Sequence, residues 1–232
     1  SYGLGSENEN LPSFVVLPDP RGLPPCGAAN WGNGFLPASH QGVIFGAEKQ
    51  PIADLRPPKS VSEMEQSATY DLLTQINEDH LKQNPGEDAL VARIKAYELA
   101  AKMQVTAPEV TSIAGETEAT REMYGLNDPV SRPFGYNCLL ARRLVERGVR
   151  CVQLFNGGHF GAPRVNWDAH EDLVANHNKN AHTFDKPTAA LTNSPRRSST
   201  NDESLTSVGM SRRRSSSTFA VAADFLAITA SD

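Results

Sequence analysis

The chain has 232 residues with 22 basic and 27 acidic side chains, which gives a formal net charge of −5. This balance argues against bulk electrostatic binding to nucleic acid, because such binding needs a basic face. No apolar run reaches the ~20 residues that a membrane-spanning helix requires. No secretory signal is visible, and because the chain opens at Ser1 without a methionine we interpret the N-terminus as processed or missing.

The three cysteines are odd in number and contain no CxxC pair, so a disulfide framework is not expected. Cys138 and Cys151 lie in apolar surroundings in the sequence. We therefore expect both to be small core residues and not reactive thiols.

The first 58 residues are rich in proline and glycine and contain one strand-like run. The sequence SFVVL at 13–17 predicts a short buried strand, and residues 18–22 have turn chemistry. Aromatic anchors favour an ordered, irregular surface layer over a linker: Phe14, Trp31, Phe35 and Phe45. A functional loop over a site is the alternative.

Two helices are predicted at 60–83 and at 87–104, separated by a break at 84–86. The first has a capping box formed by Ser60 and Glu63. Its apolar stripe consists of Val61, Met64, Ala68, Leu72 and Ile76. The short break predicts an antiparallel hairpin that caps or flanks a sheet, and Pro108 is expected to open a further turn.

A short polar helix at 116–124 is expected to end at Gly125, and a longer one runs from 135 to 147 with Tyr136, Leu139, Leu140 and Leu144 facing inward. The cations near its C-terminal end match the helix dipole and predict a solvated face, with an anion site as the alternative: Arg142, Arg143 and Arg147. The run VRCVQLF at 149–155 then predicts a short buried strand. A helix, a glycine and a strand form an αβ unit, which is typical of a sheet covered by helices.

The richest chemistry follows that strand, where an Asp and four of the six histidines lie within 24 residues. In open α/β sheets, ligands bind beyond the carboxyl ends of strands. Asp168 and His170 are separated by one residue, so an extended segment places both side chains on one face. A carboxylate with an imidazole suits zinc or another divalent transition ion. His159 could approach the same ion from the strand end.

The remaining polar residues of this segment have weaker indications. His177 shares a helical face with Leu173, which favours a packed position over a ligand, and His182 is expected to face solvent. Asp185 precedes Lys186 and Pro187, so capping of a helix and metal binding are equal alternatives for it. The sequence contains no GxSxG, P-loop, GxGxxG or HExxH motif.

Three blocks of the sequence resemble the DUF1501 proteins of planctomycete type. They are GLGSENENLPSFVVL at 3–17, NWGNGFLP at 30–37, and the segment from Gly157-Gly158-His159 to Asn166-Trp167-Asp168-Ala169-His170. The resemblance covers residues 2–190. It implies an α/β fold like that of the alkaline phosphatase and sulfatase superfamily, with a mixed central sheet flanked by helices. It also implies export or a periplasmic location for the full-length family member.

The resemblance also implies site residues. Trp167, Asp168 and His170 match the Trp-Asp-x-His element of the family, so Asp168 and His170 are expected to bind a divalent metal ion such as zinc or calcium. Asp185 corresponds to an acidic or polar position of the family and is a further expected ligand. His159 is expected as a secondary ligand or an oxyanion donor.

The chain departs from the family pattern at both ends. The earlier segment with the first metal-binding acid and the nucleophile region is missing, as is the C/S-x-P-x-R signature. After Leu191 the composition changes abruptly, with nine serines and five arginines in 193–217. We therefore expect a partial α/β region at 1–190 and a tail at 191–232 that is disordered or out of frame.

Three functions are consistent with these patterns. The first is a metal-dependent hydrolase-like protein that acts on small-molecule sulfate or phosphate esters, in truncated or degenerate form and with no assignable nucleophile. The alternative is a non-catalytic metal-binding or structural protein on the same fold. A regulatory role of the serine- and arginine-rich tail is the third. The oligomeric state stays open.

Overall fold

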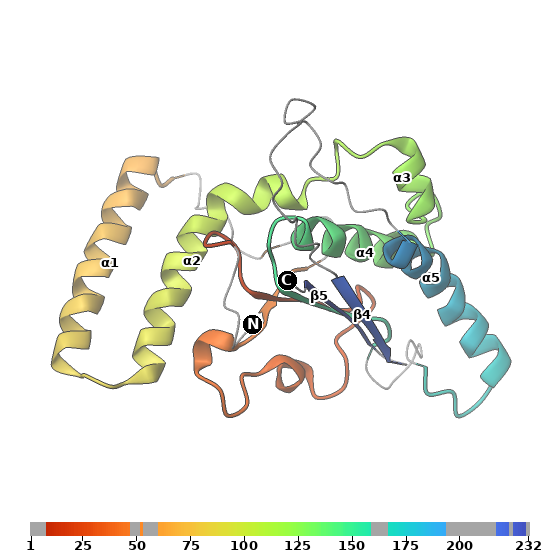
Figure 1. Ribbon diagram of the computed structural model, residues 1–232, viewed down its shortest axis with the longest axis horizontal. Helices are drawn as coiled ribbons and strands as arrows, with labels where there is room; N and C mark the ends of the chain where they lie inside the picture. Colours follow the sequence, from red (N-terminus) through yellow and green to blue (C-terminus); the bar gives the residue numbers. More distant parts are fainter. Residues whose placement is uncertain are drawn as a thin grey trace, which may run out of the picture.

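The computed structural model describes residues 8–46, 52, 60–158, 167–193, 217–222 and 225–230. They form a mixed α/β fold around a five-stranded sheet of order β2-β1-β3-β5-β4, shown in Figure 1. The strands are β1 (Phe14–Leu17), β2 (Val43–Ile44), β3 (Cys151–Phe155), β4 (Ser217–Ala222) and β5 (Phe225–Ala230). β2, β1 and β3 are parallel, whereas β5 and β4 are antiparallel to their neighbours. The predicted mixed sheet and the strands expected at 13–17 and 149–155 are confirmed.

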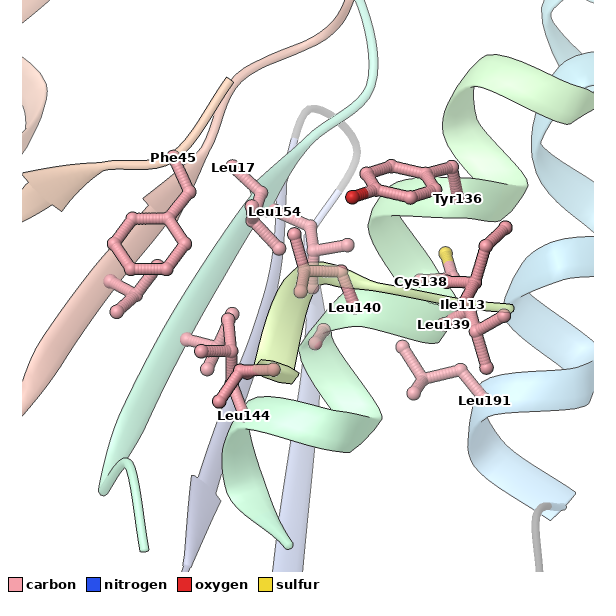
Figure 2. Close-up of a cluster of buried hydrophobic side chains, with 14 of the residues drawn as sticks. Leu17, Phe45, Ile113, Tyr136, Cys138, Leu139, Leu140, Leu144, Leu154 and Leu191 are labelled. Atoms are coloured by element: carbon pink, nitrogen blue, oxygen red, sulfur yellow. The ribbon is translucent and has the colours of Figure 1, made fainter. Parts of the chain in front are cut away.

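The larger core lies between the sheet and helix α4 (Arg132–Val145). Alternate strand residues face this helix, among them Leu17 and Leu154. Figure 2 shows these two leucines next to Leu140 of α4, with Leu144 farther along the same helix in the same cluster. The four residues expected to face inward are all buried, which confirms the helical periodicity: Tyr136, Leu139, Leu140 and Leu144.

The opposite face of the sheet is covered by the proline- and glycine-rich N-terminal layer. Val16 and Phe155 form a small buried cluster with Trp31, which ends the 3-10 helix η1 (Gly27–Trp31). The Trp31 and Phe155 rings meet edge to face at 5.8 Å. A second 3-10 helix, η2 (Ala38–His40), follows. The expected irregular layer is therefore confirmed for residues 8–46, although Phe35 is 98% exposed and anchors nothing.

Helices α1 (Glu63–Gln83) and α2 (Asp88–Thr111) form the expected antiparallel hairpin, which projects at one end of the molecule (Figure 1). The expectation that it caps or flanks the sheet is wrong for α1, because the apolar stripe of α1 is exposed at Met64, Leu72 and Ile76. Only the C-terminal part of α2 enters the core, through Met103, Ala107 and Val110.

Two local predictions for this hairpin need correction. The capping box is formed by Ser62 and Glu65 and not by Ser60 and Glu63, since Ser62 Oγ accepts the Glu65 N–H and Glu65 Oε2 accepts the Ser62 N–H. Pro108 opens no new helix but lies in the last turn of α2, where the burial of Ala107 and Val110 offsets the missing N–H.

The arginines of α4 do not form the solvated face that the sequence predicted. The carboxylate of Glu116 accepts from Arg142 Nη2 at 2.8 Å and from Arg143 Nη1 at 2.7 Å, and all three side chains are mostly buried. Glu116 stands just before the short helix α3 (Glu118–Met123). Gly125 follows α3 with φ 69°, which confirms the predicted C-terminal cap.

Helix α5 (Leu173–Asn193) begins after Asp172, whose Oδ1 accepts the Ala175 N–H at 2.9 Å. It continues through Lys186 and Pro187. Asp185 therefore lies inside a helix, so of its two alternatives helix capping is wrong and metal binding stays a prediction. α5 packs on α4 and buries Ala190 and Leu191 in the core.

Strands β4 and β5 fall within 191–232, the segment that the composition assigns to a tail. β5 pairs with β3 from Cys151↔Thr229 to Phe155↔Phe225, so β3 has a neighbour on both sides. Among the described helices, none is both long and apolar enough to cross a bilayer.

The three cysteines are free thiols. Cys138 is buried in the core, and burial raises the pKa of its thiol well above the ordinary value. Burial also raises the pKa of Cys151. Cys138 is therefore a core residue as predicted, whereas Cys151 is only half-buried; that neither thiol is reactive remains a prediction, which the raised pKa values favour.

Candidate functional site

The parallel strands β1 and β3 end side by side, with Leu17 paired to Leu154. Two positions beyond β1 stands Asp19, whose side chain is 1% exposed. Two positions beyond β3, Gly157 donates its N–H to Asp19 Oδ2 at 2.6 Å. Gly157 has φ 120°, a conformation that favours glycine. The carboxyl ends of the two strands are thus joined through one buried carboxylate.

Arg21 completes this junction. Its Nε and Nη2 donate to the Asp19 carboxylate, with Nη2 at 2.7 Å from Oδ2. Its Nη1 donates to Asn180 Oδ1 on α5 at 3.0 Å. The guanidinium is therefore fixed in orientation, and its side chain remains 22% exposed.

Two buried asparagines lie at the same strand ends. Asn137 of α4 donates through Nδ2 to the Pro18 carbonyl at 2.9 Å, and its Oδ1 has no hydrogen-bond partner among the described residues. Asn156 accepts through Oδ1 from the Trp167 indole at 2.9 Å, and its Nδ2 likewise has no partner within the described part of the chain. Each of these two hydrogen bonds requires this orientation of the amide, so a flip of either side chain would break it.

Trp167 anchors the segment that carries the predicted ligands. Its indole Nε1 donates to the carbonyl O and to Oδ1 of Asn156 at 3.2 and 2.9 Å. Its ring meets those of His177 and Phe184 edge to face at 5.6 and 6.0 Å. His177 Nε2 also lies 3.0 Å from the Trp167 carbonyl oxygen. The favoured interpretation of His177 as a packed residue is therefore confirmed.

Asp168 and His170 lie together as their spacing predicted, with His170 Nε2 at 2.7 Å from Asp168 Oδ2. Both are accessible, at 47% exposure for Asp168 and 70% for His170. A carboxylate and an imidazole on the same side can serve as two ligands of one divalent ion. They can equally form a pair in which the carboxylate orients the imidazole.

Of the other two predicted ligands, the structure describes only Asp185. Within the described ranges, no group of three His, Cys, Asp or Glu side chains could hold a metal ion. His159 lies outside the described residues. Asp185 is exposed on α5. His182 is exposed as predicted, and its Nε2 lies 2.7 Å from Asp128 Oδ2 in the loop before α4.

Sequence reasoning points to the segment that begins at Asn156 but misses the other buried or half-buried residues of this site, namely Asp19, Arg21, Asn137 and Asn180. The sequence of residues 18–22 predicts only a turn, and the backbone forms one, since the Gly22 N–H donates to the Asp19 carbonyl. The signal in the sequence is the pair Asp19 and Arg21, an acid and a base that begin two positions after a buried strand. The same rule that directed attention to the end of β3 applies to the end of β1.

A family model described as "Protein of unknown function (DUF1501)" matches residues 1–208 of the chain. The match includes every residue of the strand ends and of the Trp167–His170 segment. No curated protein and no solved structure matches the chain.

Proposed function

The chain belongs to the DUF1501 family, and from this premise we propose that it is a metal-dependent hydrolase-like protein acting on sulfate or phosphate esters. The observation that carries the proposal is the exposed Asp168–His170 pair, whose donor atoms lie 2.7 Å apart beyond the end of β3. The proposal includes a relationship to the alkaline phosphatase and sulfatase superfamily. A solved structure of this protein whose strands are connected differently from those of that superfamily would contradict the relationship.

Asp168 and His170 together fit zinc by donor chemistry, because a carboxylate oxygen and an imidazole nitrogen are both ordinary zinc ligands. Calcium is the other proposed ion, and because it takes oxygen ligands, only Asp168 of the pair would bind it. His159 and Asp185 are the further proposed ligands. A bound divalent ion supplies charge stabilisation for the ester oxygens during displacement. Asp168 and His170 would hold it at the rim of the strand ends, where both side chains reach solvent.

Arg21 supplies a second element for an anionic ester. It contacts α5 at Asn180, while Trp167 contacts the same helix at His177, and these positions are three residues apart and share a face. A guanidinium held in one orientation binds oxyanions well, because little side-chain freedom is lost. Asp19 offsets part of its charge, so Arg21 is proposed to orient the ester more than to attract it.

The second candidate is a metal-binding or structural protein without catalysis on the same fold. It is favoured by the absence of a third ligand near the pair among the described residues, because catalytic zinc sites have three protein ligands. In this case the ion, or the Asp168–His170 hydrogen bond alone, would stabilise the segment beyond β3.

The test compares hydrolysis of aryl phosphate and aryl sulfate esters by the purified chain after loading with zinc or calcium. We expect turnover that Asp168→Ala and His170→Ala each abolish, together with loss of bound metal by elemental analysis. The matched controls are Asp79→Ala and His80→Ala, the same residue types on α1. Turnover that survives both site variants contradicts the proposal, and bound metal without turnover favours the second candidate.

We also propose that the protein is exported or periplasmic, as its family resemblance implies. Fractionation of the host cell tests this directly. Recovery in the periplasmic or secreted fraction is the expected result, and recovery in the cytosol alone would contradict it.

A further inference from the structure

Asn156 stands directly after β3 and is 2% exposed. Its carbonyl O and Oδ1 both accept from the indole N–H of Trp167, the residue immediately before Asp168. We propose that Asn156 and Trp167 are positioning residues that fix the Asp168–His170 pair relative to the sheet. This inference rests on the proposed function, because it assigns these residues to the same metal-binding pair.

Trp167 is held at three separate parts of the residue. The indole nitrogen is bonded to Asn156, the ring packs against His177 and Phe184, and the carbonyl oxygen is bonded to His177 Nε2. Phe184 in turn stacks on Phe134 of α4 at 5.6 Å. Contacts with α4, with α5 and with the end of β3 thus fix the position of the backbone immediately before Asp168.

The pair itself is exposed, so packing around its own side chains cannot fix it. Its atoms are 2.7 Å apart, but a metal site also needs a fixed place for the pair relative to its other ligands and the substrate. A buried anchor one residue earlier supplies that place. Residues that orient ligands in this way typically change metal affinity 10–100-fold when they are replaced.

Asn156 is suited to this role by its position and by its amide. The Oδ1 orientation is fixed by the indole, and Nδ2 has no partner among the described residues. The amide therefore functions as an acceptor. The acceptor can be kept by Asn156→Asp and removed by Asn156→Leu, which separates its hydrogen bond from its volume.

The experiment uses the full chain and Zn²⁺ alone as the probe, measured by competition with a chelating dye. Trp167→Phe keeps the ring packing and removes only the indole donor. We expect it to weaken Zn²⁺ binding at least tenfold. Trp31→Phe is the matched control, because Trp31 lies on the opposite face of the sheet and is the only other tryptophan. It should leave Zn²⁺ affinity unchanged.

A double-mutant cycle tests the pair as a unit. Asn156→Leu should weaken Zn²⁺ binding about as much as Trp167→Phe, and the double variant should be no weaker than either single one. Asn156→Asp should retain most of the affinity. If Asn156→Leu fails to fold, the Zn²⁺ affinity of Trp167→Phe alone tests the assignment. Additive losses of Zn²⁺ affinity in the cycle would overturn it.

A merely structural clamp would lower thermal stability without a selective effect at the pair. The second measurement is therefore amide hydrogen exchange over 168–172 in the metal-free chain, which should accelerate at least tenfold in Trp167→Phe and not in Trp31→Phe. Unchanged exchange, or wild-type Zn²⁺ affinity in Trp167→Phe, overturns the positioning role. A wild-type chain that binds no Zn²⁺ overturns the proposed function instead.

Discussion

The backbone N–H of Gly157 lies 2.6 Å from Asp19 Oδ2, across 138 positions of sequence. Each residue stands two positions beyond its strand, and the two strands are hydrogen-bonded in parallel. This bond holds together the carboxyl ends of β1 and β3, where the candidate site lies. The stability of the site therefore depends on one buried carboxylate.

Replacement of Asp19 should destabilise the chain strongly. Asp19→Ala leaves Arg21 and the Gly157 N–H without their acceptor, and loss of one partner of a buried ion pair costs about 3 kcal/mol at the lower end of the usual range. Urea unfolding measures the change in the free energy of unfolding. Lys82→Ala, which breaks an exposed pair with Asp79, is the control and should have little effect. An equal effect of the two variants would contradict the prediction.

Gly135→Ala should destabilise the chain although alanine normally favours a helix by ~1 kcal/mol over glycine. A Cβ at Gly135 would lie 2.1 Å from the Tyr124 carbonyl oxygen, so α4 would have to move away from the turn after α3. We expect a loss of about 2 kcal/mol or more in thermal or urea unfolding. Gly115→Ala is the matched control, because nothing lies within 4 Å of its Cβ position. A stabilised Gly135→Ala variant would show that this packing is wrong.

The ion pairs of Glu116 with Arg142 and Arg143 should make the free energy of unfolding depend on pH. Burial alone would raise the pKa of Glu116, but Arg142 and Arg143 outweigh it and hold the pKa below its ordinary value. A carboxyl whose pKa is lower in the folded chain stabilises the fold above its unfolded pKa. That contribution is lost as the pH falls through the lower, folded value.

The measurement is the difference in unfolding free energy between the wild type and Glu116→Gln. At pH 7 we expect about 2 kcal/mol, because hydrogen bonds to a charged acceptor are lost. The difference should shrink as the pH falls below about 4.5. Use of the difference removes the effect of other carboxyls, such as Asp128 and Glu122, whose pKa values are also lowered. A difference that stays constant down to pH 3 would refute the role of this ion pair.

The three thiols should react at different rates with a thiol reagent. Cys26 is exposed, Cys138 is buried and Cys151 is half-buried. Burial raises the pKa of Cys138 and Cys151, which lowers the fraction of reactive thiolate at both. In the native chain we expect one fast thiol, which Cys26→Ser abolishes, and three in urea. Three fast thiols in the native chain would contradict the described core.

Removal of metal should affect the proposed activity selectively. Treatment with a chelator is expected to abolish ester hydrolysis, and addition of Zn²⁺ or Ca²⁺ is expected to restore it, because Asp168 and His170 are proposed to hold the ion. Circular dichroism before and after treatment checks that the fold persists. Activity that is insensitive to the chelator would exclude the metal-dependent mechanism.

Local pattern alone was enough to find β1, β3, the hairpin α1–α2, the inward face of α4 and the common side of Asp168 and His170. Each of these depends on residues a few positions apart, for which the strand and helix periods fix the directions of side chains. The same reasoning places the α1 cap two residues too early and predicts that the whole hairpin caps or flanks a sheet, which is wrong for α1. The exposure of Met64 and Ile76 depends on which elements come near α1, and no local pattern contains that information.

The sequence by itself determined which short segments become strands and helices and that an acid and an imidazole meet beyond β3. Only the tertiary structure decided that Asp19 joins the strand ends, that Glu116 forms ion pairs with two arginines of α4, and that Asn156 anchors Trp167. Those partners are distant along the chain or belong to different elements. Their contact follows from strand register and from the packing of helices on the sheet, which depend on the whole fold and not on any one segment.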